Sequence, residues 1–319
     1  MLSYALFVIG LALLMVAGDL VVRGAVGIAD RMKIPPLAIG LTVVAFGTSL
    51  PELMVCVEAA FDGAPAIAVG NVIGSNIANI LLVLGLPALI APTVTDQRDA
   101  FRNTLYMVCA SVIFLLLCFT GVLNRWEGAL MFILLIAFLW QSVTRGRGGQ
   151  DLRDEIEQLE GPAKNMTVAV LFTIAGLIGL PIAADLMVTS AREIALSWGV
   201  SEAAIGLTVV ALGTSLPELA ATVMAAIRRE AALAIGNVIG SNIFNLLGIM
   251  GLTSIIMPLE VPNEVLRFDI WIMLASAMLI LIFVGRRWRI GAPAGIALTA
   301  AYGIYCWGVF NNVNLPFFG

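Results

Sequence analysis

The chain contains no histidine and few charged residues. Of its 319 residues only 12% are charged, and the net charge is −4. The absence of histidine excludes histidine proton relays, histidine-ligated metals and nucleophiles activated by histidine. The slightly negative charge provides no basic surface of the kind that binds nucleic acids.

Cysteine is also scarce. The four cysteines, Cys56, Cys109, Cys118 and Cys306, fall in apolar runs and include no closely spaced pair of metal ligands. We interpret them as small buried apolar residues rather than as disulfides or metal ligands.

Hydrophobic residues dominate the chain, at 61% of the sequence with a mean hydropathy of +1.02. This composition is too apolar for a soluble domain and predicts membrane spans. Ten apolar runs are long enough to cross a bilayer, near residues 2–24, 34–60, 66–90, 104–120, 126–143, 167–190, 202–227, 232–257, 268–285 and 291–310. The first run lacks a basic n-region and carries Asp19, so we expect a first span rather than a cleaved signal peptide.

Two blocks of sequence occur twice, 166 residues apart. Residues 40–53 read GLTVVAFGTSLPEL and residues 206–219 read GLTVVALGTSLPEL; residues 69–86 and 235–252 share the pattern GNVIGSNI. The chain therefore divides into two repeats of five spans, residues 1–143 and 167–319, joined by a polar linker at 144–166. An odd number of spans in each repeat inverts the second, a signature of secondary transporters. The predicted fold is an all-α polytopic membrane protein with ten transmembrane helices in two inverted five-helix repeats.

The distribution of basic residues predicts the orientation. If the N-terminus lies outside, 14 of the 17 basic residues fall in cytoplasmic loops, as the positive-inside rule requires. We expect a multi-pass protein of the inner (cytoplasmic) membrane with both termini outside and the linker in the cytoplasm.

Each copy of the first block places a glutamate, Glu52 or Glu218, inside an apolar run. A carboxylate within a membrane is costly and is a functional-site hypothesis by default. Glycine and proline in GTSLPE favour a helix break near residues 47–51 and 213–217. A broken helix exposes carbonyl oxygens that can bind cations. Further oxygens come from the hydroxyls of the same motif, those of Thr48, Ser49, Thr214 and Ser215.

The second block adds serine and asparagine oxygens, from Ser75, Asn79, Ser241 and Asn245. Asn71 and Asn237 either cap their helices or approach the same site. Calcium accepts six to eight such oxygens in flexible geometry. Two carboxylates neutralise one divalent ion, and they could instead accept several sodium ions or protons. The residues alone leave these coupling ions open.

Structural interpretations compete with the cation-site hypothesis. The two glutamates could be buried acids paired with a distant arginine, although no basic residue lies within the central spans. The serines and threonines could bond to helix carbonyls, and Asn79 and Asn245 could join helices. For the aligned pair Asp19 and Asp185 we favour a packing or interface role. Glu58 has Met224 as its counterpart, so we favour a structural or entry-path role over direct ligation.

At these motifs the chain resembles the calcium/cation antiporter superfamily, specifically the bacterial and archaeal sodium/calcium exchangers. The resemblance covers nearly the whole chain, and GTSLPE paired with GNVIGSNI twice is a specific signal. It implies that Glu52 and Glu218 are the calcium carboxylates and that Thr48 and Thr214 add backbone carbonyls. It further implies sodium sites that share four residues with the calcium site, namely Thr48, Glu52, Thr214 and Glu218. These sodium sites are completed by Ser49, Ser75, Ser215, Ser241 and the carbonyls of Ala45 and Ala211. Asn79 and Asn245 would line the centre.

The resemblance also implies a mechanism of alternating access, in which the first and sixth spans slide across a more rigid core. One position departs from the family pattern. Several members, including potassium-dependent exchangers, carry aspartate where this chain has Asn245. With asparagine in both halves the site has less negative charge, which predicts transport without potassium.

The sequence therefore predicts a sodium/calcium antiporter that exports calcium in exchange for sodium, with no cofactor besides the transported ions and no required oligomer. The nearest alternative is an antiporter that exchanges calcium, or another divalent cation, for protons. An intramembrane enzyme is a different class, but the chain has no His–Ser pair, no HExxH and no GxGD motif, so we expect no enzyme. A non-transporting membrane scaffold would not need repeated polar ligands.

Overall fold

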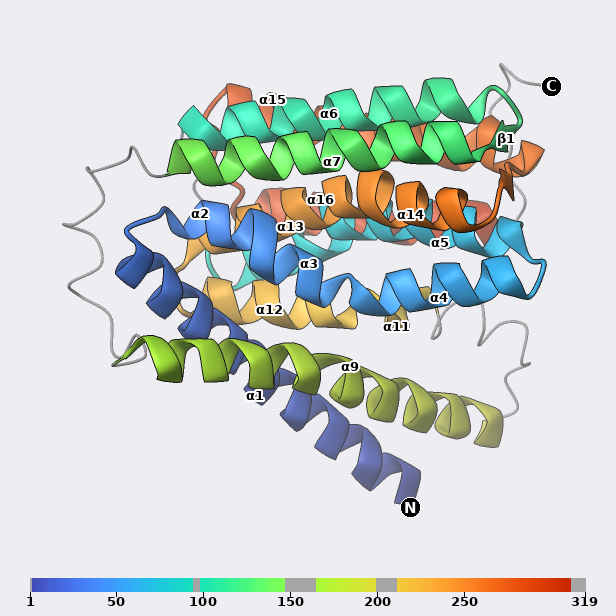
Figure 1. Cartoon of the computed structure of the whole chain (residues 1–319). Helices are drawn as coiled ribbons and strands as arrows, with labels where there is room; N and C mark the ends of the chain where they lie inside the picture. The colour runs from blue at the N-terminus through green and yellow to red at the C-terminus, as the bar shows by residue number, and fades with distance from the viewer. Residues whose placement is uncertain (1, 94–97, 147–164, 199–210, 311–319) are drawn as a thin grey trace.

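The computed structural model describes residues 2–93, 98–146, 165–198 and 211–310, and these form an almost entirely helical molecule (Figure 1). Six of the described helices are long and apolar enough to cross a membrane, or seven if one bent pair counts as a single span. The membrane protein class is therefore confirmed. The count of ten spans, the inversion of the repeats and the boundaries of the linker stay predictions, and most of the linker lies outside the described residues.

The helical segments follow the apolar runs of the sequence. In the first half they are α1 (Leu2–Met32), α2 (Pro36–Ile39), η1 (Gly40–Val44), α3 (Ala45–Thr48), α4 (Leu50–Phe61), α5 (Pro65–Ala78), η2 (Asn79–Val83), η3 (Pro87–Leu89), α6 (Arg98–Cys118) and α7 (Arg125–Gly146). In the second half they are α9 (Met166–Ser197), α11 (Ala211–Gly213), α12 (Leu216–Ile227), α13 (Ala231–Ile243), η5 (Phe244–Ile249), α14 (Met250–Ile256), η6 (Val265–Asp269), α15 (Ile270–Gly285) and α16 (Ala292–Phe310). Two short strands, β1 (Val122–Leu123) and β2 (Leu259–Glu260), pair antiparallel.

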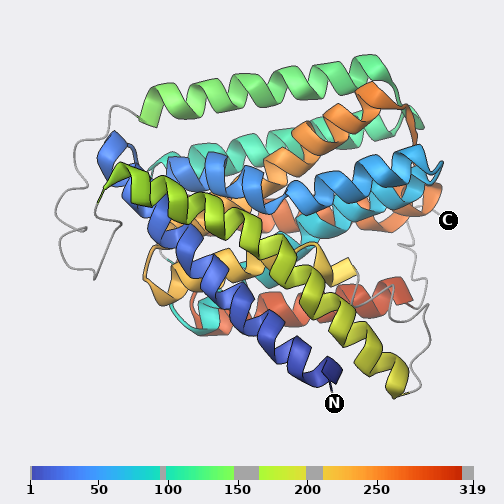
Figure 2. The same cartoon turned by 60° about the horizontal axis from the view of Figure 1, so that its bottom comes forward.

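The longest helices, α1 and α9, cross each other along one side of the molecule (Figures 1 and 2). Glycines allow this close crossing. A Cβ atom on Gly24 would lie 2.5 Å from the backbone nitrogen of Thr173, and one on Gly176 would lie 2.6 Å from Cγ2 of Val21. Small residues at a helix interface let backbones approach in a membrane, where packing rather than water exclusion holds helices together.

The buried apolar residues form two clusters. The larger cluster lies among α5, α6, α7 and α13–α15 and includes Phe114, Met131 and Ile243. The smaller cluster includes Val21 of α1 and Leu180 of α9, and it extends to α12 and the start of α13. The crossed pair of α1 and α9 therefore packs on a cluster distinct from the larger one, and shares that cluster with α12 and the start of α13.

Both copies of GTSLPE interrupt a helix, as the sequence predicts. In the first half α3 ends at Thr48 and α4 begins at Leu50, and the helical stretch Pro36–Thr48 is bent by 43° against α4. In the second half α11 ends at Gly213 and α12 begins at Leu216. The proline of each motif lies in the first turn of the following helix, where its missing N–H is tolerated. Residues 206–210 of the second copy lie outside the described residues.

Both copies of the second block continue into π-helical turns. The segment η2 begins at Asn79 and η5 begins at Phe244, one residue before Asn245. Isolated π turns inside helices are rare and frequently occur at functional sites. The two blocks therefore place their asparagines at equivalent irregular points of the helices.

The interpretation of the cysteines is confirmed only in part. Cys56 and Cys118 are buried, Cys306 is half-buried, and all four thiols are free. The prediction is wrong for Cys109, whose side chain is exposed. This residue lies on the face of α6 that points away from the bundle, where an apolar side chain of a membrane span can face lipid.

Candidate cation site

The two motif glutamates meet in the interior of the molecule. Glu52 lies in the first turn of α4, Glu218 lies in the first turn of α12, and both are 0% exposed. Their carboxylates are close enough to interact electrostatically. Two like charges buried together are costly unless a cation or a proton compensates them. The two copies of the phrase therefore contribute to one site.

Each carboxylate lies beside a hydroxyl-bearing residue of the other half. The hydroxyl of Ser49 donates a hydrogen bond of 2.9 Å to Oε1 of Glu218. Thr214, together with Ser75, lies beside the Glu52 carboxylate. Within the described part of the chain, neither oxygen of Glu52 and only one oxygen of Glu218 has a hydrogen-bond partner.

Buried polar atoms without a hydrogen-bond partner gather at the predicted site. Eight of the twelve predicted residues carry such an atom, as judged over the described residues: Glu52, Ser75, Asn79, Thr214, Ser215, Glu218, Ser241 and Asn245. Each buried unsatisfied polar group costs free energy and calls for a physical explanation. A set of oxygens that a hard cation can bind is one explanation, since calcium and sodium take their ligands from such atoms.

The remaining predicted residues lie at the helix breaks. The Thr48 hydroxyl is 3.3 Å from Oδ1 of Asn237 and 3.4 Å from the Ala45 carbonyl. That carbonyl also accepts a hydrogen bond of 3.1 Å from the Ser49 N–H. Ala211 begins α11. The sequence-predicted ligand roles of Ala45 and Ala211 stay predictions.

The asparagines of the second block divide into two kinds. Asn79 donates a hydrogen bond of 3.4 Å to Oδ1 of Asn242, whereas the amide of Asn245 has no partner among the described residues. Asn76 also donates to the backbone carbonyl of Asn242, at 3.4 Å. Sequence reasoning missed Asn76 and Asn242, which join α5 to α13. The signal was present, because both belong to the repeated GSN triplet.

The capping role considered for Asn71 and Asn237 is wrong. The N-cap positions of α5 and α13 are Ala64 and Glu230, so both asparagines lie within their helices. Asn237 instead contacts the broken helices, through hydrogen bonds to Thr48 and to residues of α12. The alternative that it approaches the site therefore fits.

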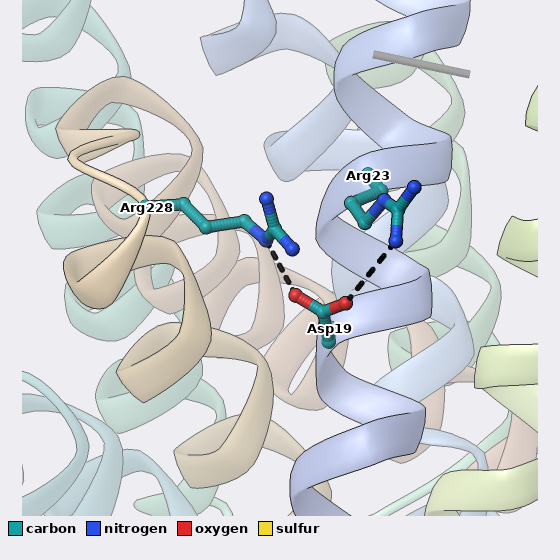
Figure 3. A network of polar contacts seen from close by, with 3 residues as sticks. All are labelled: Asp19, Arg23 and Arg228. Carbon is teal, nitrogen blue, oxygen red and sulfur yellow. Dashed lines mark hydrogen bonds and ion pairs between the residues drawn. The ribbon is translucent and has the colours of Figure 1, made fainter. Parts of the chain in front are cut away.

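No arginine of the described residues pairs with either glutamate. The arginines nearby pair elsewhere. Nε of Arg228, at the C-terminal end of α12, donates to Oδ1 of Asp19, and Arg23 lies 3.8 Å from the other carboxylate oxygen (Figure 3). The interface role favoured for Asp19 is confirmed, since this network connects α1 to α12.

Glu58 lies apart from the buried carboxylates. It lines a groove of about 530 Å³ on α4 together with Met54, Phe61 and Asp62. Its side chain is exposed, and the groove extends to Leu53, the residue after Glu52. This placement agrees with the preference for a role outside direct ligation.

The donor set is oxygen-rich and low in charge. Within the described residues, no three histidine, cysteine, aspartate or glutamate side chains gather in a way that could hold a metal ion. The site has two carboxylates and otherwise neutral hydroxyl, amide and carbonyl oxygens. Such a set suits hard cations and not soft metals, which prefer sulfur or imidazole.

Comparison with known proteins identifies relatives along nearly the whole chain. The model of the sodium/calcium exchanger protein family matches residues 2–144 and 168–311. The inner membrane protein YrbG of Escherichia coli is 36% identical, with 95% of each chain covered. The sodium/calcium exchanger MaX1 of Methanosarcina acetivorans is 33% identical over 94% of this chain and 96% of its own. A solved structure of the sodium-calcium exchanger NCX_Mj superposes with a TM-score of 0.84 at 33% identity, covering 97% of this chain and 99% of its own.

Proposed function

We propose that this chain, which belongs to the sodium/calcium exchanger family, exports calcium from the cell in exchange for sodium. The observation that carries the proposal is the cluster of buried oxygens around Glu52 and Glu218 that have no hydrogen-bond partner among the described residues. Both ions compete for one set of oxygens, so the exchange makes and breaks no covalent bond. The named exchanger relatives, MaX1 and NCX_Mj, support the same ion pair.

The proposed site residues are matching positions of the two repeats. Calcium binds to the carboxylates of Glu52 and Glu218 with carbonyls of Thr48 and Thr214. Sodium ions use the same carboxylates with oxygens of Ala45, Ser49, Ser75, Ala211, Ser215 and Ser241. The amides of Asn79 and Asn245, both 0% exposed, line the centre. Two carboxylates balance one calcium or two sodium ions, which is why the ions exclude each other.

We further propose ten spans in two inverted repeats, both termini outside, and alternating access through movement of α1 and α9. The separate apolar cluster around Val21 and Leu180 supports this movement. Because this cluster is distinct from the larger one, α1 and α9 can shift against the larger core without disrupting its packing, although they must slide on α12.

Transport without potassium is the last part of the proposal. Position 245 carries a neutral amide. In a site with only two carboxylates, an extra monovalent cation beside calcium has no third negative charge to balance it. Calcium flux should therefore be unchanged when choline replaces potassium.

The test is calcium-45 uptake by proteoliposomes loaded with sodium, with the membrane potential clamped. Sodium-loaded vesicles should accumulate calcium and choline-loaded vesicles should not. Glu52→Gln and Glu218→Gln should abolish the uptake, whereas Glu260→Gln, which neutralises an exposed carboxylate in β2, should retain it.

A proton-coupled exchanger is the competing candidate, because a proton would also compensate the Glu52 carboxylate, whose oxygens have no hydrogen-bond partner within the described residues. A pH-sensitive dye inside the same vesicles separates the two. Calcium uptake that follows an imposed pH gradient and ignores sodium would reject sodium coupling while keeping the site.

A further inference from the structure

A single buried amide connects three segments next to the Glu218 carboxylate. Nδ2 of Asn237 lies 3.0 Å from Oγ1 of Thr222 and 3.4 Å from the backbone carbonyl of Glu218, and Oδ1 accepts the Thr48 hydroxyl at 3.3 Å. Asn237 is 1% exposed and Thr222 is 0% exposed. The amide therefore links α13 to the start of α12 and to the end of α3.

Thr222 and the Glu218 carbonyl together determine which way this amide points: the carbonyl can only accept, and the Thr222 hydroxyl provides the shorter contact. Thr222 lies one turn after Glu218 in α12, so its hydroxyl and the Glu218 carbonyl face the same side of the helix. Both can accept from an NH₂ group, and a buried asparagine turns its donor side towards acceptors. With Nδ2 held there, Oδ1 faces Thr48, whose side chain also lies beside the Glu218 carboxylate.

The same positions in the first half carry a weaker connection. The counterparts of Asn237 and Thr222 at the repeat offset are Asn71 and Cys56. Nδ2 of Asn71 lies 3.5 Å from Sγ of Cys56, and the thiol itself faces the Ala68 carbonyl at 3.5 Å. Sulfur is a weak acceptor and a weak donor. Thr214, the counterpart of Thr48, has a hydroxyl without a partner among the described residues.

We infer that Thr222 and Asn237 are positioning residues that hold Thr48 and the first turn of α12 ready for the cation. Cys56 in the equivalent place leaves Thr214 and Glu52 to be ordered by the cation itself. The inference rests on the proposed function, because it concerns the same site. Ligands that are already in place lose less conformational freedom on binding, so Thr222 and Asn237 tighten cation binding without contacting the ion.

The matched test is the same substitution at both positions. Thr222→Val removes the acceptor at nearly constant shape, and Cys56→Val removes the thiol at the equivalent position. Thr222→Val should raise the half-saturating calcium concentration of sodium-driven flux about fivefold, the equivalent of about 1 kcal/mol for one neutral hydrogen bond. Cys56→Val should stay within about twofold, and Thr222→Ser, which keeps the hydroxyl, should match the unaltered protein.

The maximal rate separates positioning from folding. A variant that only folds poorly loses maximal rate at an unchanged half-saturating concentration, whereas the positioning role moves that concentration. If Thr222→Val yields no folded protein, Thr222→Cys, which copies the residue of the first half, should raise the concentration about threefold, by part of one hydrogen bond. Equal shifts in the two valine variants, or no recovery with serine, would overturn the inference.

The calcium-induced rise in unfolding temperature of the detergent-solubilised protein is measured in parallel, since it needs no flux. If vesicles of the unaltered protein show no sodium-driven flux, the proposed function fails. The positioning role is then judged from this rise alone: it holds if Thr222→Val weakens the rise and Cys56→Val does not, and it fails if both leave the rise unchanged.

Discussion

Glu52 and Glu218 stand at equivalent places in the two halves, but the surrounding protein treats them differently. Glu218 accepts a hydrogen bond from Ser49 through its side chain and one from Asn237 through its carbonyl. Both carboxylate oxygens of Glu52 lack a partner in the described part of the chain. The surrounding phrases differ only at Phe46 and Leu212. Ser49 and Ser215 occupy the same place in the phrase, yet only Ser49 bonds to a glutamate of the other half among the described residues. The environments of the two buried charges therefore differ through how the two copies pack, and not through the sequence of the phrase.

The one difference within the phrase has its own structural consequence. The Phe46 ring packs edge-to-face on Phe244, with ring centroids 5.0 Å apart. The counterparts of these two residues are Leu212 and Ala78, which cannot form an aromatic pair. The two halves thus differ at both contact partners together, as expected when a pair of residues packs as a unit.

Removing either carboxylate gives the largest expected effect and tests whether the two halves are equally necessary. Glu52→Gln and Glu218→Gln should each weaken calcium binding about 100-fold, since leaving a buried charge without its partner costs about 3 kcal/mol. Isothermal titration of the purified variants measures this.

The same two variants should differ in cation-free buffer. Glu52→Gln removes a buried carboxylate that has no hydrogen-bond partner in the part of the chain that the structure describes, so its apparent unfolding temperature should rise above that of Glu218→Gln. An equal rise in both variants would contradict the asymmetry between the two glutamates.

The serines of the two motifs offer a second, smaller contrast. Ser49→Ala deletes a hydrogen bond to a carboxylate and should lower cation-free stability by about 2 kcal/mol. Ser215→Ala deletes a buried hydroxyl without a partner in the described part and should leave stability unchanged or raise it. Thermal unfolding of both variants without calcium or sodium is the measurement, and equal losses would show that the serines are equivalent.

The two central asparagines should also respond differently to added charge. Asn79→Asp replaces an amide that donates to Asn242, whereas Asn245→Asp alters an amide with no partner among the described residues. Both variants should be less stable without cations, because each adds a third buried carboxylate. Asn245→Asp should recover more fully when calcium is added, and unfolding scans with and without calcium decide this.

The smallest effect is expected at the ion pair between α1 and α12. Asp19 and Arg228 have side chains that are 22% and 30% exposed, so Asp19→Asn should cost about 0.5 kcal/mol. High salt should reduce the difference from the unaltered protein by screening the pair. Asp185→Asn, at the equivalent position of the second half, is the control. A loss that does not depend on salt would mean that packing, not charge, is what Asp19 provides.

The positions of many residues of the candidate site were predictable because they repeat. Repetition identified Glu52, Glu218 and the hydroxyls beside them, and the glycine and proline of the motif predicted where the helices break. Burial of both glutamates followed from their place in apolar runs. The roles of individual ligands were carried over from the family resemblance and stay proposals.

Other features could not be read from a linear pattern. The sequence left open whether Asn237 caps its helix or approaches the site, since nothing in the sequence reveals that α13 begins six residues earlier, at Ala231. The exposure of Cys109 depends on which face α6 turns towards the bundle, and all faces of an apolar span look alike in sequence. Asp19 and Arg228 are 209 positions apart, and only the packing of α1 on α12 brings them together.

The ion pair of Asp19 and Arg228 should affect the rate of the transport cycle more than the affinity for the transported cations. It lies outside the cation site, but any displacement of α1 along the end of α12 must separate its two charges. The energy of that separation adds to the activation barrier of the movement, and about 0.5 kcal/mol slows a step roughly twofold. Mobile ions lower the same barrier by screening the charges. The turnover of a transport cycle that moves α1 would thus quicken with ionic strength, even where the transported ions are saturating.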